Sequence, residues 1–516
     1  MTSAQDPLQV VRDNMAANRA DLAIALLEEL TARDPRDFAA WKLLGFAYHE
    51  EQRESEASNA FGKAAALNDR DAATAAAHAQ SCYLAGFPAV QQFRHCLQLA
   101  PDDLNARRGM ASALAAENQR DAAEAILCDS VRQHPDWLEG HRYLASLRYT
   151  TGEKSQFAAS YDEACATQPG NLALRMAWFR SVAQTREWPS ATRILDEGER
   201  QFGRKPPLVL ARLFVASESG DIALASELFA ETASVVDVVR DMALIRHSLR
   251  NGDLTTAEAT ASRYVDTPSA GVVWPYLSLI WRLRGDPRAQ WLDGSPPFVA
   301  NIDLDFGNPE RGGDRELHQL ADLLRKLHTA RSPFVEQSVR GGTQTDQNLF
   351  LRHEPILQRL KSRVQLAVCD YVARLPASVP GHPLLGVSRD DTLRGRVFFS
   401  GSWSVRLAAQ GFNVSHTHPM GWISSALYIA LPPPPQLGSP PAGWIQFGTP
   451  PAELNLSLRP TLQMEPKVAR LLLFPSRTWH STVPFAEGER LVVSFDVRAP
   501  RAAVSANAKH RSIPPS

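Results

Sequence analysis

The chain has 516 residues, with 55 basic and 56 acidic side chains and 44% hydrophobic residues. This length predicts more than one domain with ordinary buried cores, and a formal charge of -1 provides no overall field to hold nucleic acid or anionic lipid. The five cysteines show no paired C-x-x-C spacing, which argues against a disulfide framework and against a thiolate zinc site.

The N-terminus, Met-Thr-Ser-Ala-Gln-Asp-Pro, lacks the basic start and the apolar core of a signal peptide. No segment reaches the roughly 18 unbroken apolar residues of a membrane-spanning helix. We therefore expect a soluble, cytoplasmic protein with neither a membrane nor a nucleic acid as its partner.

The N-terminal half has a period of 34 residues, seen between prolines that follow amphipathic segments: Pro101, Pro135 and Pro169. Pro35 starts the same series, and Asp69 stands at the next position of that period. One unit contains the aromatic, leucine and small residues of the tetratricopeptide pattern, namely Trp41, Leu44, Gly45, Tyr48, Ala57, Phe61 and Ala64. The pattern predicts pairs of helices that cross closely at the small residues.

Later units are looser, but Gly220-Asp221, Gly252-Asp253 and Gly285-Asp286 recur after 32 and 33 residues, as turns between paired helices would. Residues 1–290 therefore resemble an all-α tetratricopeptide-repeat solenoid. Such a stack leaves a concave groove that commonly binds peptides, so we expect a protein or peptide partner there. A spacer or a dimerisation arm is the alternative, because the architecture does not identify the ligand.

After residue 290 the composition changes, and Gly294-Ser295-Pro296-Pro297 breaks the helical pattern. Two amphipathic helices are predicted, over Leu317–His328 and Glu354–Leu375. Short apolar strands separated by proline and glycine turns follow: Val397–Leu407, Phe412–His418, Trp422–Leu431, Gly443–Phe447, Ala469–Phe474, Thr478–Val483 and Leu491–Val497. Residues 291–500 thus predict a two-sheet jelly-roll with flanking helices, and 501–516 a flexible tail. Pro432 to Pro435 predict a stiff loop.

Two histidines, His416 and His418, lie two residues apart in a segment of strand composition. On an extended backbone both imidazoles point to the same face, so two nitrogens can reach one metal ion. A third histidine, His480, follows 62 residues after His418, and Arg490 comes ten residues later.

This order of residues resembles the Fe(II)/2-oxoglutarate oxygenases of the prolyl-hydroxylase-related type, in particular a group that reads His-x-His-Pro. The resemblance covers about the last two hundred residues, on the usual domain scale, and includes Gln337 to Thr345. It implies a double-stranded β-helix that holds Fe(II) through His416, His418 and His480. The usual ligand set has a carboxylate where this chain has His418, so His418 is either a ligand or a neighbour of the metal.

The resemblance also implies a site for 2-oxoglutarate at Arg490, because a guanidinium fork matches two carboxylate oxygens; a surface ion pair is the alternative. Tyr428 falls where related hydroxylases bind the cosubstrate, although a buried core tyrosine is equally consistent. Alternation along the last strand places Arg490, Ser494 and Asp496 on one face. Asp496 would supply the negative charge that His418 lacks, or orient the substrate.

Two further arginines are candidates. Arg406, ten residues before His416, would add charge beside the cosubstrate or bind substrate. Arg340 would contact substrate from Gln337 to Thr345, which we expect to form a loop over the site.

Together these features predict an Fe(II)- and 2-oxoglutarate-dependent dioxygenase that hydroxylates a substrate recruited by the repeats, such as a protein or peptide. One alternative is a tetratricopeptide adaptor with a catalytically silent jelly-roll. Another is a three-histidine dioxygenase that uses no keto acid. The substrate, the hydroxylated atom and the oligomeric state stay open.

Overall fold

The computed structural model describes residues 6–307, 313–334 and 337–500. Contacts divide the chain into two compact units, residues 1–148 with 346–361 and residues 149–345 with 362–516. The predicted domain boundary at residue 290 stays a prediction. The predicted tail, 501–516, lies outside the described residues.

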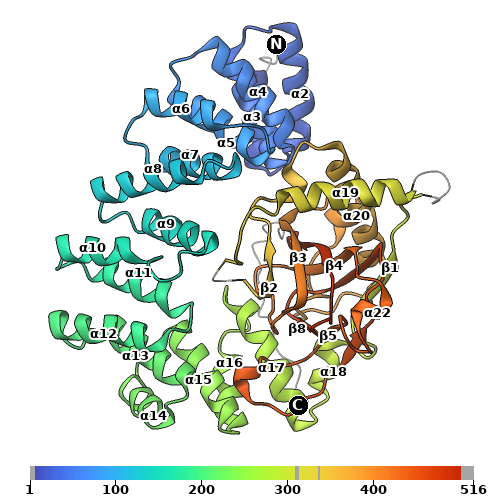
Figure 1. Cartoon of the computed structure of the whole chain (residues 1–516). Helices are drawn as coiled ribbons and strands as arrows, with labels where there is room; N and C mark the ends of the chain where they lie inside the picture. The colour runs from blue at the N-terminus through green and yellow to red at the C-terminus, as the bar shows by residue number, and fades with distance from the viewer. Residues whose placement is uncertain (1–5, 308–312, 335–336, 501–516) are drawn as a thin grey trace. The chain divides into compact units, whose positions relative to one another are not determined.

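The first unit is built from successive helices, most of which pack on the next one along the chain (Figure 1). They are α1 (Pro7–Ala16), α2 (Ala20–Arg33), α3 (Phe38–Glu50), α4 (Glu54–Leu67), α5 (Ala72–Leu84), α6 (Val90–Leu99), α7 (Leu104–Ala116), α8 (Arg120–Gln133) and α9 (Leu138–Thr151). Aspartates begin several of them: Asp37 accepts from the Ala40 amide and Asp71 from the Thr74 amide, which satisfies donors that the helix leaves free.

The predicted tetratricopeptide unit is confirmed in α3 and α4. Ala57, Phe61 and Ala64 of α4 are buried. A Cβ at Gly45 would lie 2.6 Å from the Phe61 ring, so only glycine lets α3 approach that ring. The predicted segments that end near Pro35 and Pro101 correspond to α2 and α6, which end at Arg33 and Leu99.

The segment 346–361 also belongs to the first unit. It holds a short 3-10 helix, η2 (Leu349–Leu351), and the start of α20 (Pro355–Arg374). The His353 amide donates to the Ala85 carbonyl at 2.8 Å, and Lys361 Nζ donates to the Gln52 carbonyl at 2.9 Å.

The second unit continues with further helices, α10 (Ala159–Thr167), α11 (Leu172–Ala183), α12 (Trp188–Phe202), α13 (Pro206–Ser219), α14 (Ile222–Glu231), α15 (Val238–Arg250), α16 (Leu254–Ser262), α17 (Ala270–Arg284) and α18 (Arg288–Asp293). The predicted turns are confirmed. Gly220 and Gly285 are left-handed C-caps, and Asp221 and Asp253 cap the following helices. Among the described residues, no helix has the length and apolar character needed to cross a bilayer.

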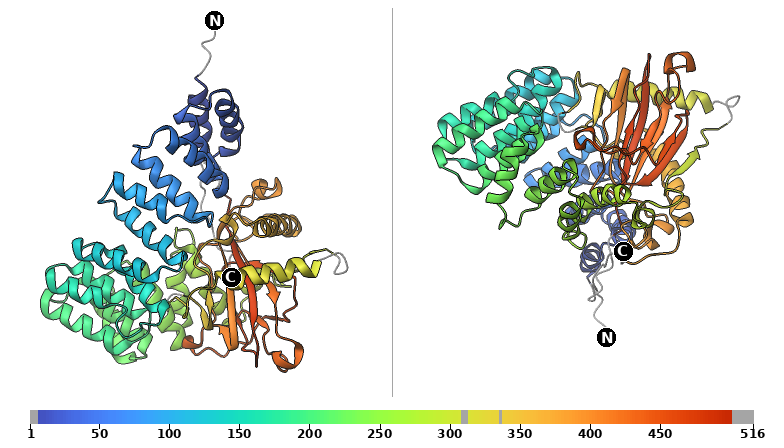
Figure 2. Two further views of the ribbon diagram at one scale, coloured as in Figure 1. Left: turned by 45° about the horizontal axis from the view of Figure 1, so that its top comes forward. Right: turned by 90° about the horizontal axis from the view of Figure 1, so that it is seen from below.

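The β-strands form two antiparallel sheets (Figures 1 and 2). They are β1 (Ala300–Asp303), β2 (Val339–Gln344), β3 (Phe399–Asn413), β4 (Ile423–Ala430), β5 (Ile445–Phe447), β6 (Leu462–Met464), β7 (Arg470–Pro475), β8 (His480–Thr482) and β9 (Arg490–Val497). The larger sheet has the order β1-β7-β4-β9-β3-β2 and the smaller β6-β5-β8. Between the strands along the chain lie helices α19 (Gly313–Leu327), α20 and the short α21 (Asp390–Leu393).

The hydrophobic core between the sheets joins residues of β4, β7 and β9 to residues of β5, including Tyr428, Phe474, Val492, Ile445 and Phe447. The predicted fold, a tetratricopeptide-like region followed by a two-sheet antiparallel domain with flanking helices, is therefore confirmed.

Several predicted local structures are wrong. Residues 414–418 are not a strand, because β3 ends at Asn413, and Pro434–Leu437 form the single helical turn α22 where a loop was expected. The expected loop at Gln337 to Thr345 contains the edge strand β2, which pairs with β3 through a bulge between Arg340 and Gly342. At an edge, polar and glycine residues are compatible with a strand, since one side has no ladder partner to satisfy.

Candidate metal centre

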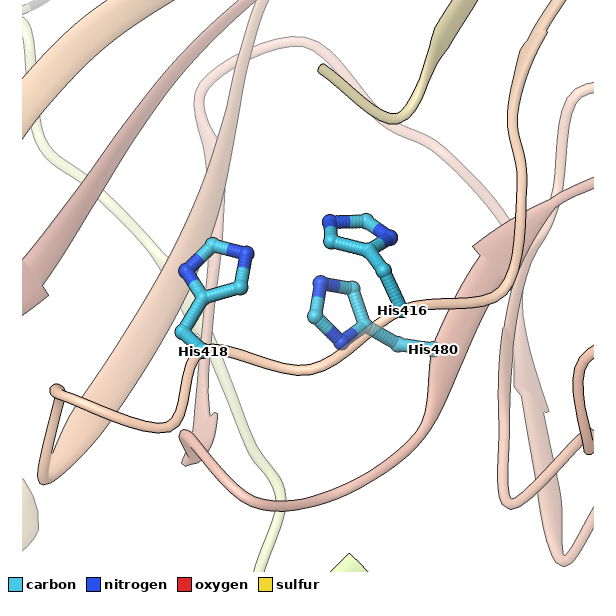
Figure 3. Close-up of side chains that lie close together, drawn as sticks. All are labelled: His416, His418 and His480. Carbon is cyan, nitrogen blue, oxygen red and sulfur yellow. The ribbon is translucent and has the colours of Figure 1, made fainter. Parts of the chain in front are cut away.

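The three histidines His416, His418 and His480 converge (Figure 3). Their ring centroids lie 4.2 Å apart for His416 and His480, 5.1 Å for His416 and His418, and 5.2 Å for His418 and His480. One nitrogen from each lies within 4.8 Å of the other two. This spacing suits one metal ion held on one face by three imidazoles.

Backbone hydrogen bonds hold the two histidine segments together although residues 414–418 form no strand. His416 and His480 form an isolated antiparallel bridge, with both N–H···O distances at 3.1 Å. The His418 amide donates to the Ser476 carbonyl at 2.8 Å. The predicted convergence of His416 and His418 thus arises from this pairing rather than from strand alternation.

Each imidazole has an acceptor near its Nδ1 atom. His416 Nδ1 lies 2.8 Å from the Val414 carbonyl and His480 Nδ1 lies 3.0 Å from the Thr478 carbonyl. His418 Nδ1 lies 2.7 Å from both carboxylate oxygens of Asp496. With Nδ1 donating in each ring, Nε2 is left with a lone pair for a metal, which is the usual arrangement around ligating histidines.

Burial keeps two of these rings neutral. It lowers the pKa of His416 to about 3 and the pKa of His480 well below its usual value, and the neighbouring imidazoles act in the same direction. A neutral imidazole is the form that binds a metal.

Asp496 lies on the predicted face of β9, but it contacts His418 and does not line the cavity beside the histidines. Ser424 Oγ donates a further hydrogen bond to the Asp496 carboxylate at 2.6 Å. A carboxylate is therefore present, but it contacts the Nδ1 side of the His418 ring and not the side that faces the other histidines.

The cavity has a volume of about 220 Å³ and is lined by both sheets. The three histidines line it together with Arg490, Tyr428, Val492 and Ser494. The cavity thus brings together the three predicted metal residues and three of the four predicted cosubstrate residues; Arg406 is the one that is missing. Within the described part of the chain no aspartate or glutamate lines this cavity.

Arg490 is 2% exposed. One Nη donates to the Gly443 carbonyl at 3.0 Å, and Nε has no hydrogen-bond partner among the described residues. Burial lowers the pKa of the Arg490 guanidinium and raises that of the Tyr428 hydroxyl, while Arg490 itself acts to lower the latter. An arginine stays charged at neutral pH even so, and a buried cation with a free donor requires an anion.

The other two predicted arginines lie elsewhere. Arg406 forms an ion pair with Glu489 and is 42% exposed in its side chain. Arg340 is exposed and donates to the carbonyls of Gln337 and Val339, each at 2.9 Å. Neither lines the cavity, so the structure does not bring them to the site.

Ser338 and Asn413 are site residues that sequence reasoning missed. The Ser338 hydroxyl lies 3.2 Å from His416 Nε2, and Asn413 Nδ2 donates to Ser338 Oγ at 3.0 Å. Both line the cavity. Ser338 lies in the segment Gln337 to Thr345, which the sequence predicted to be a loop over the site, whereas Asn413 ends β3 and had no sequence signal of its own.

Residues 401–496 match the family model described as "Putative 2OG-Fe(II) oxygenase". The match contains all three histidines, Arg490 and Asp496. The chain thus combines a tetratricopeptide-like region with a segment, residues 401–496, that is similar to the 2OG-Fe(II) oxygenase family.

The chain is also similar to solved repeat structures. MamA from Desulfovibrio magneticus RS-1 has 13% identity over 32% of this chain and 95% of that chain, with a TM-score of 0.29. YrrB, titled a TPR protein with an unusual peptide-binding site, has 18% identity over 33% and 89%, with a TM-score of 0.28. A tetratricopeptide repeat protein from Parabacteroides merdae ATCC 43184 has 13% identity over 46% and 96%, with a TM-score of 0.30. No curated protein matches this chain.

Proposed function

We propose that this protein is an Fe(II)- and 2-oxoglutarate-dependent dioxygenase that hydroxylates its substrate. The observation that carries the proposal is Arg490, a fully buried cation with a free Nε, in the same cavity as three converging imidazoles. Three histidines can hold a metal ion without a buried arginine nearby. The Arg490 guanidinium is explained if the molecule that binds the metal also carries a second, distant carboxylate.

The charges of the cavity support a dianion. Neutral histidines and Arg490 give a charge of +1, and Fe(II) would raise it to +3, with no acidic side chain among the described lining residues to offset it. The 2-oxoglutarate dianion would reduce this to +1. Its distal carboxylate matches the guanidinium fork of Arg490.

The fit of the residues assigns their roles. His416, His418 and His480 would hold Fe(II), and Asp496 orients His418 through its Nδ1 proton. Arg490 binds the distal carboxylate, with Tyr428 and Ser494 on the same cavity wall. Bound Fe(II) would activate O₂, the oxidant: one oxygen atom would enter a C–H bond of the substrate and the other would enter succinate, formed with CO₂ from 2-oxoglutarate.

For the substrate, we propose that the repeat region recruits a protein or peptide. Stacked helical repeats present extended surfaces suited to peptides, which is the physical support for this assignment.

The test is succinate formation by full-length protein supplied with Fe(II), 2-oxoglutarate, O₂ and ascorbate as reductant for turnover without substrate. We expect succinate from the wild type, at least ten-fold less from His416→Ala, and an unchanged rate from Arg406→Ala as the matched control. No succinate from an iron-loaded wild type would contradict the proposal. Iron-dependent O₂ consumption without a keto acid would favour the keto-acid-independent dioxygenase instead.

A further inference from the structure

Helix α17 of the helical region contacts the residue beside His480. Trp479 Nε1 donates to the Pro275 carbonyl at 2.9 Å, and the Trp479 ring packs edge-on against Tyr276 with centroids 5.4 Å apart. Trp479 is 7% exposed and shares one buried cluster with Val273, Trp274 and Leu277. The backbone that leads into His480 is therefore fixed by α17, which Figure 1 shows near β8.

The same helix contacts the residue beside His418. A Cβ at Gly271 would lie 2.3 Å from the Pro419 carbonyl oxygen, a distance that side chains do not adopt. Backbone therefore meets backbone at this point, and the contact requires glycine in α17. The neighbouring Gly421 amide closes the turn by donating to the His418 carbonyl at 3.0 Å.

The two contacts come from one face of one helix. Gly271 and Pro275 are four residues apart, so they lie one above the other, about 6 Å along the axis. The chain segments that they touch carry two different histidines of the candidate metal centre, His418 and His480. A single rigid element thus sets the separation of these two segments.

A third contact strengthens this arrangement. Arg282 at the end of α17 donates to the carbonyl oxygens of Gly448 and Arg459. The Gly448 amide in turn donates to the Trp479 carbonyl at 2.7 Å. Trp479 is consequently held by α17 both directly and through residue 448.

We propose that α17 is a positioning element of the metal centre, in which Gly271 and Pro275 place the segments that carry His418 and His480. The inference rests on the proposed function only in taking these histidines as metal ligands. It assigns to the last long helix of the repeat-like region a role in the oxygenase site, beyond any role in recruiting substrate.

The test uses Co(II) as a spectroscopic probe bound to the full chain, with Gly271→Ala and Trp479→Phe as variants. Alanine favours a helix over glycine by about 1 kcal/mol, so a loss in Gly271→Ala would come from the clash with Pro419. Trp479→Phe keeps an aromatic ring but removes the donor to Pro275. Gly198→Ala in α12 and Trp41→Phe in α3 are matched controls. A Cβ at Gly198 would meet Leu208 and Arg175, and the Trp41 indole donates to the Pro35 carbonyl at 3.0 Å, so neither variant touches α17 or the histidine segments.

We expect Gly271→Ala to weaken Co(II) binding at least ten-fold and to change the visible ligand-field spectrum, as loss of a supporting contact around a metal ligand does. Trp479→Phe should act in the same direction. In the metal-free protein, amide hydrogen exchange should become faster in residues 414–421 for Gly271→Ala. Both controls should keep the wild-type spectrum and affinity, whatever they do to the unfolding temperature.

Variants with wild-type Co(II) affinity, spectrum and exchange would overturn the inference and leave the proposed function untouched. If Gly271→Ala does not fold, Trp479→Phe decides alone. A folded wild type that binds no Co(II) would contradict the proposed function, and the positioning role with it.

Discussion

At the scale of single residues, the site differs from a two-histidine, one-carboxylate set in where its negative charge lies. Asp496 contacts His418 Nδ1 with both oxygens at 2.7 Å, and Ser424 also donates to it. A carboxylate in that position raises the basicity of the imidazole and fixes its orientation. His418 can therefore serve a metal without being replaced by a carboxylate.

Asp496→Asn is expected to lower Fe(II) affinity by about 10- to 100-fold, because the charge behind His418 is lost while the shape of the side chain is kept. Equilibrium competition with a chelating dye under argon measures this. Asp303→Asn is the control, since Asp303 lies on the edge strand β1 and pairs with Lys467 and Arg470. Equal affinities for wild type and Asp496→Asn would remove Asp496 from the metal centre.

The family resemblance predicted that His416, His418, His480 and Arg490 lie together, and alternation placed Asp496 on the same face of β9 as Arg490; the structure brings the first four into one cavity and places Asp496 against His418. They could not identify the partner of each side chain. Glu489, which pairs with Arg406, is 83 residues away in the chain, and no periodicity connects the two. The spacing of Arg406 from His416 therefore suggested a cosubstrate residue, although Arg406 lies outside the cavity and pairs with Glu489.

At the scale of elements, β2 shows why a polar, glycine-rich stretch is difficult to assign. Gly341 has a φ of +68° and lies at the bulge between Arg340 and Gly342. A Cβ at Gly342 would lie 2.3 Å from the Arg406 carbonyl oxygen. These glycines let the backbone of β2 approach the backbone of β3 closely. A polar, glycine-rich segment alone would instead indicate a loop. The helices and the central strands, which have regular apolar periods, were predicted well.

Gly342→Ala is expected to destabilise the second unit by about 1–3 kcal/mol, since the new methyl group collides with the β3 backbone. Urea denaturation followed by tryptophan fluorescence measures the free energy of unfolding. Gly401→Ala in β3 serves as the control, because its Cβ would meet only the Trp403 ring, at 3.4 Å. The bulge assignment fails if both variants have the same stability.

At the scale of the whole molecule, helices α15, α16 and α17 share a hydrophobic core with the sheet domain of the same unit. Trp479 and Leu454 are buried in one cluster with Ile245 of α15, Ala257 of α16 and Trp281 of α17. These three helices therefore complete the interior of the sheet domain. Local sequence patterns identify both folds but cannot show that they share a core.

A fragment of residues 291–500 is consequently expected to expose this cluster and to lose cooperative unfolding. A fragment of residues 149–500 keeps α15, α16 and α17 and is the matched control, since both fragments lack residues 1–148. Near-ultraviolet circular dichroism and a thermal melt measure the difference. Two fragments with the same cooperative transition would show that the shared core is dispensable.

Acid should destabilise the second unit through His382. Its Nδ1 accepts from the Leu384 and Leu385 amides at 3.0 Å each, and burial lowers the pKa of His382 from 6.5 to about 4. Between pH 6.5 and pH 4 the unfolded chain binds a proton at His382 that the folded chain does not bind. The contribution of His382 to the free energy of unfolding is therefore largest above pH 6.5 and decreases as the pH is lowered. His382→Gln should reduce this slope by up to about 1.4 kcal/mol per pH unit in protein freed of metal by a chelator.

His49 provides a control of opposite sign. Its hydrogen bond to Glu54, at 2.7 Å, raises the pKa of His49 above 6.5. Its stabilising effect is therefore complete below pH 6.5 and is lost as the pH rises through the folded pKa. The difference between wild type and His49→Gln should shrink on going to alkaline pH. A parallel pH dependence for His382→Gln and wild type would contradict the assignment of His382.

The most direct test of the whole account is an anaerobic titration of Fe(II)-loaded, full-length protein with 2-oxoglutarate, followed by the visible charge-transfer band of the bound keto acid. The account predicts a saturable band in the wild type and in Arg406→Ala, and an affinity at least 30-fold weaker in Arg490→Ala, because a buried charge pair loses one partner. A band of equal affinity in all three proteins, or no band in an iron-loaded wild type, would contradict it.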